Sequence, residues 1–114
     1  MPPKKNPLKL NKLQLRTLAL AQILAELPDI TRVDDETGDI TLLQLPHAHG
    51  DHMHIGEFVV SARDASGLTN PAVWKALERK DLACNATHLT ITLTPLGQAY
   101  ETGLGDRFLS PSSH

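Results

Sequence analysis

The leucine-rich stretch "NKLQLRTLALAQILAELP", residues 11–28, constrains the fold more than any other part of this 114-residue chain. Asn11 is suited to cap a helix, and Pro28 ends it because proline cannot continue the backbone hydrogen bonding. Apolar residues recur at the spacing of one helix face, at Leu10, Leu13, Leu20, Leu24 and Leu27, with Thr17 in the same row. The pattern predicts an amphipathic helix that packs against a core.

The apolar face of this helix is wider than one core contact needs, because Leu15, Leu18 and Ile23 extend it. Two explanations remain open. Two sides of the helix are covered by its own domain, or part of the face pairs with a second copy in a homodimer through residues 10–27.

Length and composition predict a single soluble domain. The chain has 40% hydrophobic and 21% charged residues, which is an ordinary globular composition. Cys84 is the single cysteine, which suits a reducing compartment. No apolar run reaches the roughly 18 residues of a membrane span, and the start "MPPKKNPLKLNK" lacks the pattern of a secretory signal. We therefore expect a cytoplasmic protein with no membrane partner.

Charge is distributed unevenly along the chain, although the net charge is only −2. Residues 1–25 contain five basic residues and no acid, whereas residues 26–39 contain six acids and one arginine. A strongly basic domain would favour nucleic acid, and this overall balance does not. We expect residues 1–9 to form a flexible basic arm, residues 10–109 one domain, and residues 110–114 a flexible tail.

The remaining patterns predict an α+β fold, mainly helical, with a small β-hairpin or sheet. The expected elements are a hairpin over 30–45, a helix over 56–65, a helix from Pro71 capped by Thr69 or Asn70, a strand over 87–94, and a helix capped by Thr94. The hairpin has an acidic tip in which Gly38 supplies a turn position.

The stretch "FVVSARDASGLTNPAVWKALERKDLA", followed by "LTITLTPLGQAY", resembles the winged helix-turn-helix regulators over residues 55–100. Gly67 and Leu68 match the turn, and Val73 and Leu77 match the interior of the second helix. "LTPLGQAY" is similar to the phrase that ends many wings and opens the next helix. Asp81 departs from the family, which usually has glycine there, and the segment after Leu82 is short for a wing.

The resemblance implies a winged-helix-like, DNA-binding and transcription-regulatory module. It implies an exposed recognition surface containing Thr69, Asn70, Trp74, Lys75 and Arg79. Lys75 and Arg79 would then meet phosphates, and Asn70 would reach a base edge. Winged helices also serve as protein-interaction modules, so the alternative is an adaptor whose exposed Trp74 and apolar first helix meet a partner protein. A third interpretation makes Lys75, Glu78 and Arg79 a solvated ion-paired face, with Trp74 packed against a neighbouring element.

The motif "HAHGDHMH" places five residues able to bind a metal within eight positions: His47, His49, Asp51, His52 and His54. Neutral imidazole is a good ligand for zinc, nickel or copper. Alternate residues of an extended segment point the same way, so His47 and His49 can chelate together, as can His52 and His54. The motif therefore predicts a transition-metal site, zinc or nickel, that makes the regulator metal-responsive. The alternative is a polar connector in which His54 or Asp51 caps the following helix.

The order His-x-His-x-Asp-His in this motif also matches the zinc-binding pattern of the metallo-β-lactamase superfamily. That resemblance implies a hydrolase in which His47, His49, Asp51 and His52 bind two ions. The superfamily is about twice as long and uses further ligands downstream, where this chain has only His88 and His114. We interpret the match as coincidental and expect the protein not to be an enzyme.

Overall fold

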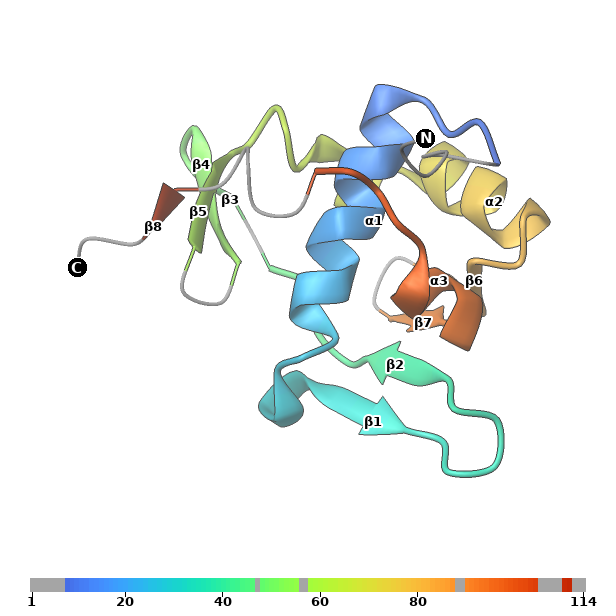
Figure 1. Ribbon diagram of the computed structural model, residues 1–114. Coiled ribbons are helices and arrows are strands. Elements are labelled where there is room, and N and C mark those ends of the chain that lie inside the picture. Colours follow the sequence, from blue (N-terminus) through green and yellow to red (C-terminus); the bar gives the residue numbers. More distant parts are fainter. Residues whose placement is uncertain (1–7, 47, 56–57, 88–89, 105–109, 112–114) are drawn as a thin grey trace.

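The computed structural model describes residues 8–46, 48–55, 58–87, 90–104 and 110–111, and α1 lies between two antiparallel sheets (Figure 1). The helices are α1 (Lys12–Leu24), α2 (Pro71–Arg79) and α3 (Pro95–Ala99), with two 3-10 turns, η1 (Pro28–Ile30) and η2 (Ser66–Thr69). One sheet has the order β1-β2-β7-β6, from β1 (Thr31–Val33), β2 (Ile40–Leu42), β6 (Ala83–Cys84) and β7 (Ile91–Leu93). The other has the order β3-β4-β5-β8, from β3 (Ala48–His49), β4 (His52–Ile55), β5 (Phe58–Ser61) and β8 (Ser110–Pro111).

The predicted α+β class is therefore confirmed, and helical residues outnumber strand residues among those described, but the expectation of one small hairpin or sheet is wrong. The structure has two sheets of four strands each. Each of these strands has only two to four residues and so gives a short signal in the sequence.

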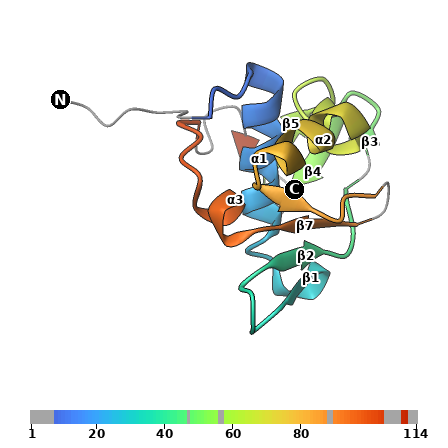
Figure 2. The same cartoon turned by 90° about the vertical axis from the view of Figure 1, so that its right-hand side faces the viewer.

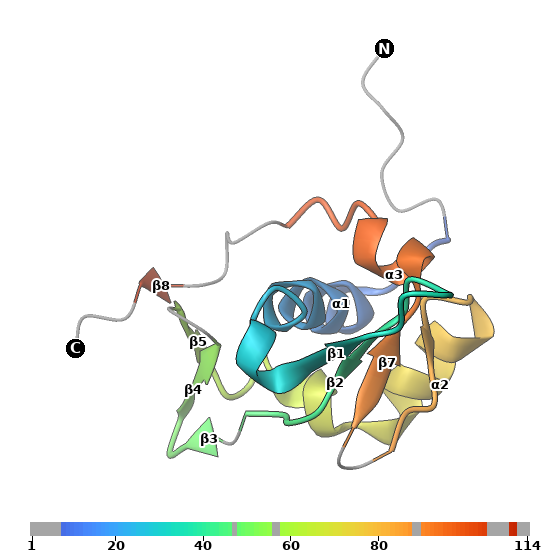
Figure 3. The same ribbon diagram turned by 90° about the horizontal axis from the view of Figure 1, so that it is seen from below.

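Helix α1 starts and packs as its sequence predicts. The Asn11 side chain accepts a hydrogen bond from the Gln14 backbone N–H, and the Gln14 side chain accepts one from the Asn11 backbone N–H. The buried residues of α1 lie on several sides of the helix: Thr17, Leu18, Ala19, Leu20, Ala21 and Leu24. Figure 3 shows why, because one sheet lies on each side of α1. The wide apolar face is thus accounted for by the domain itself, and no second copy is needed to explain it.

The hairpin predicted over residues 30–45 is confirmed as β1 and β2, which pair antiparallel. Its acidic tip holds Gly38 at φ 81°, and the Asp34 carboxylate accepts a backbone hydrogen bond from Glu36. Strand β2 continues the sheet by pairing with β7, where the hydroxyls of Thr41 and Thr92 lie 2.9 Å apart. Figure 2 shows β1, β2 and β7 in this order, with α2 beyond β7.

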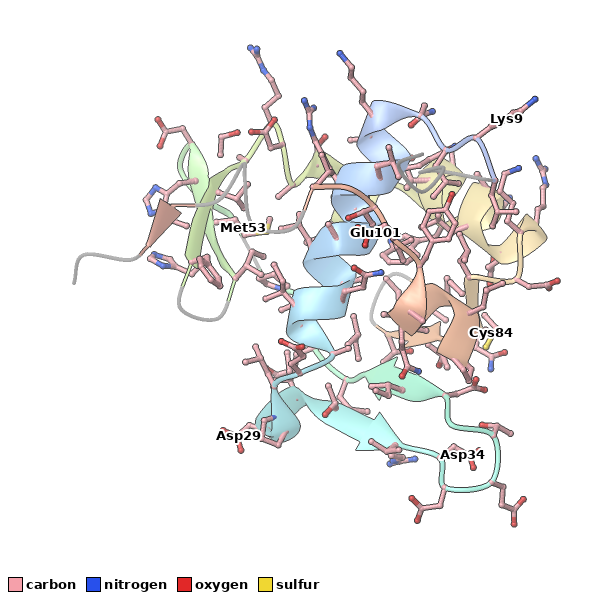
Figure 4. The ribbon with its side chains drawn as sticks, viewed as in Figure 1. Lys9, Asp29, Asp34, Met53, Cys84 and Glu101 are labelled. Atoms are coloured by element: carbon pink, nitrogen blue, oxygen red, sulfur yellow. The ribbon has the colours of Figure 1, made fainter. Side chains whose placement is uncertain are left out.

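The prediction of a helix over residues 56–65 is wrong. Residues 58–61 form β5, which pairs antiparallel with β4, and residues 62–65 form turns. Met53, Ile55 and Val60 are buried on one face of this pair, and Figure 4 shows Met53 on the side that faces α1. Buried residues in this strand pair recur every two positions, as in a strand, rather than every 3.6 positions, as in a helix. The helical interpretation failed because the short run "FVVSA" fits either period.

The two ends of the predicted domain are anchored where the structure describes them. Leu8, within the expected basic arm, is half-buried, and its backbone N–H donates to the Tyr100 hydroxyl at 3.1 Å. Ser110 and Pro111, within the expected tail, pair with β5. None of the helices in the described ranges is long and apolar enough to span a membrane.

Candidate functional site

The start of α2 is fixed by its own side chains. The Asn70 carboxamide oxygen accepts a hydrogen bond from the backbone N–H of Ala72 at 3.0 Å, so Asn70 rather than Thr69 is the cap. Pro71 follows at the first helical position, where its missing N–H costs nothing. Asn70 is half-buried and its amide oxygen is engaged by the cap, whereas Thr69 is exposed.

Trp74 is only 3% exposed, so its predicted place on the outer surface is wrong. The indole packs into the core beside Val73 and Leu77, and its Nε1–H donates to the Leu68 carbonyl at 2.9 Å. This hydrogen bond ties η2 to α2 and satisfies the polar edge of the ring. The adaptor hypothesis depended on an exposed Trp74 and loses that support.

Lys75 and Arg79 are both exposed on α2, one helical turn apart, as the sequence predicted. Across the part of the chain that the structure describes, neither side chain forms an ion pair. We call Thr69, Asn70, Lys75 and Arg79 the α2 face. It presents two unneutralised cations beside a capped helix start.

The end of α2 explains how aspartate is accommodated at position 81, where the winged-helix pattern usually has glycine. Asp81 adopts a left-handed conformation with φ 62°. The Asp81 N–H donates to the Glu78 carbonyl, and the Leu82 N–H donates to the Leu77 carbonyl at 3.0 Å. These two bonds form a Schellman motif, in which glycine is usual and aspartate is among the tolerated alternatives. The chain therefore turns directly from α2 into β6 at Asp81.

A cavity of about 330 Å³ lies between α2, η2 and residues 86–87 after β6. Its lining comes from both sides of this junction: Leu68, Thr69, Pro71, Trp74, Lys75, Glu78, Ala86 and Thr87. The Glu78 carboxylate closes the junction by accepting a hydrogen bond from the backbone N–H of Ala86 at 3.1 Å. Two residues of the α2 face, Thr69 and Lys75, thus also belong to a cavity.

The histidine motif forms part of a hairpin rather than a loop before a helix. Strands β3 and β4 pair antiparallel, with His49 opposite His52, and Gly50 takes φ 68° in the turn between them. His47 lies outside the described residues. Since the expected helix is absent, neither Asp51 nor His54 caps one, and that part of the alternative is wrong.

His52 and His54 lie on the same face of β4, opposite the buried Met53 and Ile55. Their ring centroids are 5.2 Å apart in an edge-to-face arrangement. The exposed Asp51 carboxylate is 3.5 Å from Nδ1 of His52. His52 therefore has both Asp51 and His54 as neighbours. The described residues contain no group of three or more His, Cys, Asp or Glu side chains placed to hold a metal ion.

Comparisons with family models, with curated proteins and with solved structures find no match to this chain.

The other residues that line the cavity were not predicted as site residues: Leu68, Pro71, Glu78, Ala86 and Thr87. Glu78 could have been found, since it lies on the same helical face as Trp74 and Lys75 at three- and four-residue spacing. Ala86 and Thr87 could not, because only the pairing of β6 with β7 brings them beside α2.

Proposed function

We propose that this chain is a winged-helix-like module that binds duplex DNA through the α2 face. The observation that carries the proposal is the exposed pair Lys75 and Arg79 on a capped helix that leads directly into a strand pair. Phosphate contacts by lysine and arginine supply most of the affinity in non-specific DNA binding.

The order of elements around α2 supports this proposal. In winged helix-turn-helix domains, the recognition helix is followed by two antiparallel strands, and the segment joining them forms the wing. Here α2 leads into β6, which pairs with β7, and β2 adds a third strand beside β7. The turn η2 precedes α2 in the position of the first helix of the pair, and α1 contacts both. In this scheme residues 85–87, which follow β6, correspond to the start of a short wing.

The charge around the α2 face limits the affinity that we expect. Glu78 and Asp81 lie among the cations of the helix, and the chain has a net charge of −2. Non-specific protein–DNA complexes typically have Kd values of roughly 10⁻⁴ to 10⁻⁶ M at physiological salt. We place this module at the weak end of that range as a monomer, with tighter binding only in low salt.

Fluorescence anisotropy with a labelled random duplex, measured over a series of salt concentrations, tests the proposal. Lys75→Ala and Arg79→Ala should each weaken binding and reduce the slope of log K against log salt by about 0.9. Arg32→Ala is the matched control, since it removes one exposed positive charge from β1, at the opposite edge of the sheet from β6. Equal losses in all three variants would show that only net charge matters and would reject the α2 face.

A second candidate function is transition-metal binding at the β3–β4 hairpin, favoured by the placement of His52 and His54 on one face. Zinc or nickel would be held by these imidazoles, and His47, His49 and Asp51 are their neighbours in the sequence. Native mass spectrometry with added Zn²⁺ or Ni²⁺ tests this. His52→Ala and His54→Ala should each abolish a stoichiometric adduct, whereas His114→Ala should retain it.

Repeating the anisotropy titration with the metal present then tests responsiveness. If metal bound at the hairpin controls DNA affinity, adding metal should change the DNA affinity of the original chain but not that of His54→Ala. Binding curves that coincide with and without metal would leave a metal site but reject a metal-responsive regulator.

A further inference from the structure

We infer that the cavity between α2, η2 and residues 86–87 binds a small organic acid that combines an apolar body with one carboxylate. Its volume, about 330 Å³, lies at the lower end of the range of ligand sites, roughly 300–1,000 Å³. A small aromatic or branched aliphatic acid fits such a volume.

The walls of the cavity favour an apolar body. Leu68, Pro71, Trp74 and Ala86 contribute hydrocarbon surface. The one polar atom of the indole, Nε1, is already bonded to the Leu68 carbonyl, so the ring offers its apolar surface to a ligand. The hydroxyls of Thr69 and Thr87 also donate within their own segments, to the carbonyls of Ser66 and Thr90.

The charged groups of the cavity favour a single negative charge. The Lys75 ammonium has no carboxylate partner among the residues that the structure describes. Glu78 lies on α2 like Lys75, and its carboxylate accepts a hydrogen bond from the Ala86 backbone N–H. The negative charge of Glu78 would repel a dianion such as a phosphate monoester. A monoanionic carboxylate gains the lysine contact with the least repulsion from Glu78.

Binding of such an acid does not depend on the proposed function, but its consequence does. Lys75 belongs both to the cavity and to the α2 face, so an acid bound to Lys75 would remove one of the two cations proposed to meet phosphate. We therefore infer that the acid and DNA compete for the protein.

Binding can be followed through Trp74, because it is the only tryptophan in the chain and lines the cavity. Phenylacetate, titrated against the full chain, should shift the single indole N–H signal in a ¹H–¹⁵N correlation spectrum saturably. Acetate lacks the apolar body and phenylacetamide lacks the charge, so each should bind at least roughly fivefold more weakly. Lys75→Gln should weaken the binding of phenylacetate by a similar factor. Lys80→Gln, just after the end of α2 and outside the cavity, should not.

Two results would overturn this inference. Equal shifts by acetate and phenylacetate would show an ion on the surface rather than a ligand in the cavity. Unchanged phenylacetate affinity in Lys75→Gln would show that the carboxylate is not recognised there. Competition is measured separately, as the loss of DNA anisotropy on adding phenylacetate. A protein that binds phenylacetate without binding DNA keeps the cavity assignment and rejects only the proposed function.

Discussion

The carboxylate of Glu78 in α2 accepts a hydrogen bond from the backbone N–H of Ala86 at 3.1 Å, across eight positions of the chain. This bond joins α2 to the segment after β6 and so holds the two sides of the cavity together. The acceptor is a carboxylate, and hydrogen bonds to a charged group are stronger than hydrogen bonds between neutral groups. The Glu78 side chain is also half-buried.

Replacing Glu78 by alanine should therefore destabilise the protein by about 1–2 kcal/mol, because the Ala86 N–H loses its partner. Glu78→Gln keeps an acceptor oxygen and should cost less than half as much. Urea unfolding followed by Trp74 fluorescence gives both values. Equal destabilisation by the two substitutions would contradict a role for the hydrogen bond itself.

A second close approach joins η2 to α1. A side chain at Gly67 would overlap the Thr17 side chain, and the Thr17 hydroxyl is buried with no hydrogen-bond partner among the described residues. Gly67→Ala should therefore destabilise the fold by about 1–3 kcal/mol through overpacking.

The double variant Thr17→Ala with Gly67→Ala separates this cause from a backbone effect. Removing the Thr17 hydroxyl and methyl frees the space that the new methyl group needs. The double variant should therefore lose less free energy of unfolding than the sum of the two single variants, by about 0.5–3 kcal/mol. Ser66→Ala, at the exposed neighbouring position, is the control and should stay within about 0.5 kcal/mol of the original chain. Strict additivity would mean that the contact with Thr17 is not what requires glycine.

The elements predicted correctly from sequence have local causes. The Asn11, Asn70 and Thr94 caps, with proline following two of them, fixed three helix starts without reference to the rest of the chain. The β1–β2 hairpin was predictable for the same reason, since Gly38 marks its turn.

The parts that sequence could not predict depend on contacts between distant residues. Strand β5 is a strand because β4 and β8 pair with it, although its own residues also fit a helix. The winged-helix resemblance places Trp74 on the exposed surface of the second helix. In the structure its indole packs in the core and donates a hydrogen bond to the Leu68 carbonyl. The cavity needs Ala86 beside α2, and only the register of β6 with β7 sets that.

Asp81 offers a direct test of the turn that connects α2 to β6. Its φ of 62° is costly for residues with a side chain, while the Schellman hydrogen bonds at this position need only the backbone. Asp81→Gly should stabilise the protein by about 1 kcal/mol, whereas Asp81→Ala should not stabilise it. Thermal unfolding measures both. If glycine lowered the midpoint, the left-handed conformation at this position would be wrong.

Cys84 provides a test of the electrostatics between β6 and its neighbours. Burial raises the pKa of the Cys84 thiol above its ordinary value, and the carboxylates of Asp39 and Glu78 raise it further. Only the thiolate reacts with iodoacetamide, so alkylation of the folded protein should reach half its maximal rate at a higher pH than alkylation of the urea-unfolded chain. Asp39→Asn should lower that midpoint. Asp34→Asn, at the hairpin tip and not among the causes of the shift, should leave it unchanged.

The same shift affects stability at alkaline pH. The folded protein holds the thiol proton more tightly than the unfolded chain, so this contribution is intact below the unfolded pKa and is lost as pH rises through the folded pKa. Cys84→Ser removes the group, and its free energy of unfolding should therefore decline less between neutral and alkaline pH than that of the original chain. Parallel declines in the two proteins would mean that the thiol ionises equally easily in both states, and that neither burial nor the two carboxylates act on it.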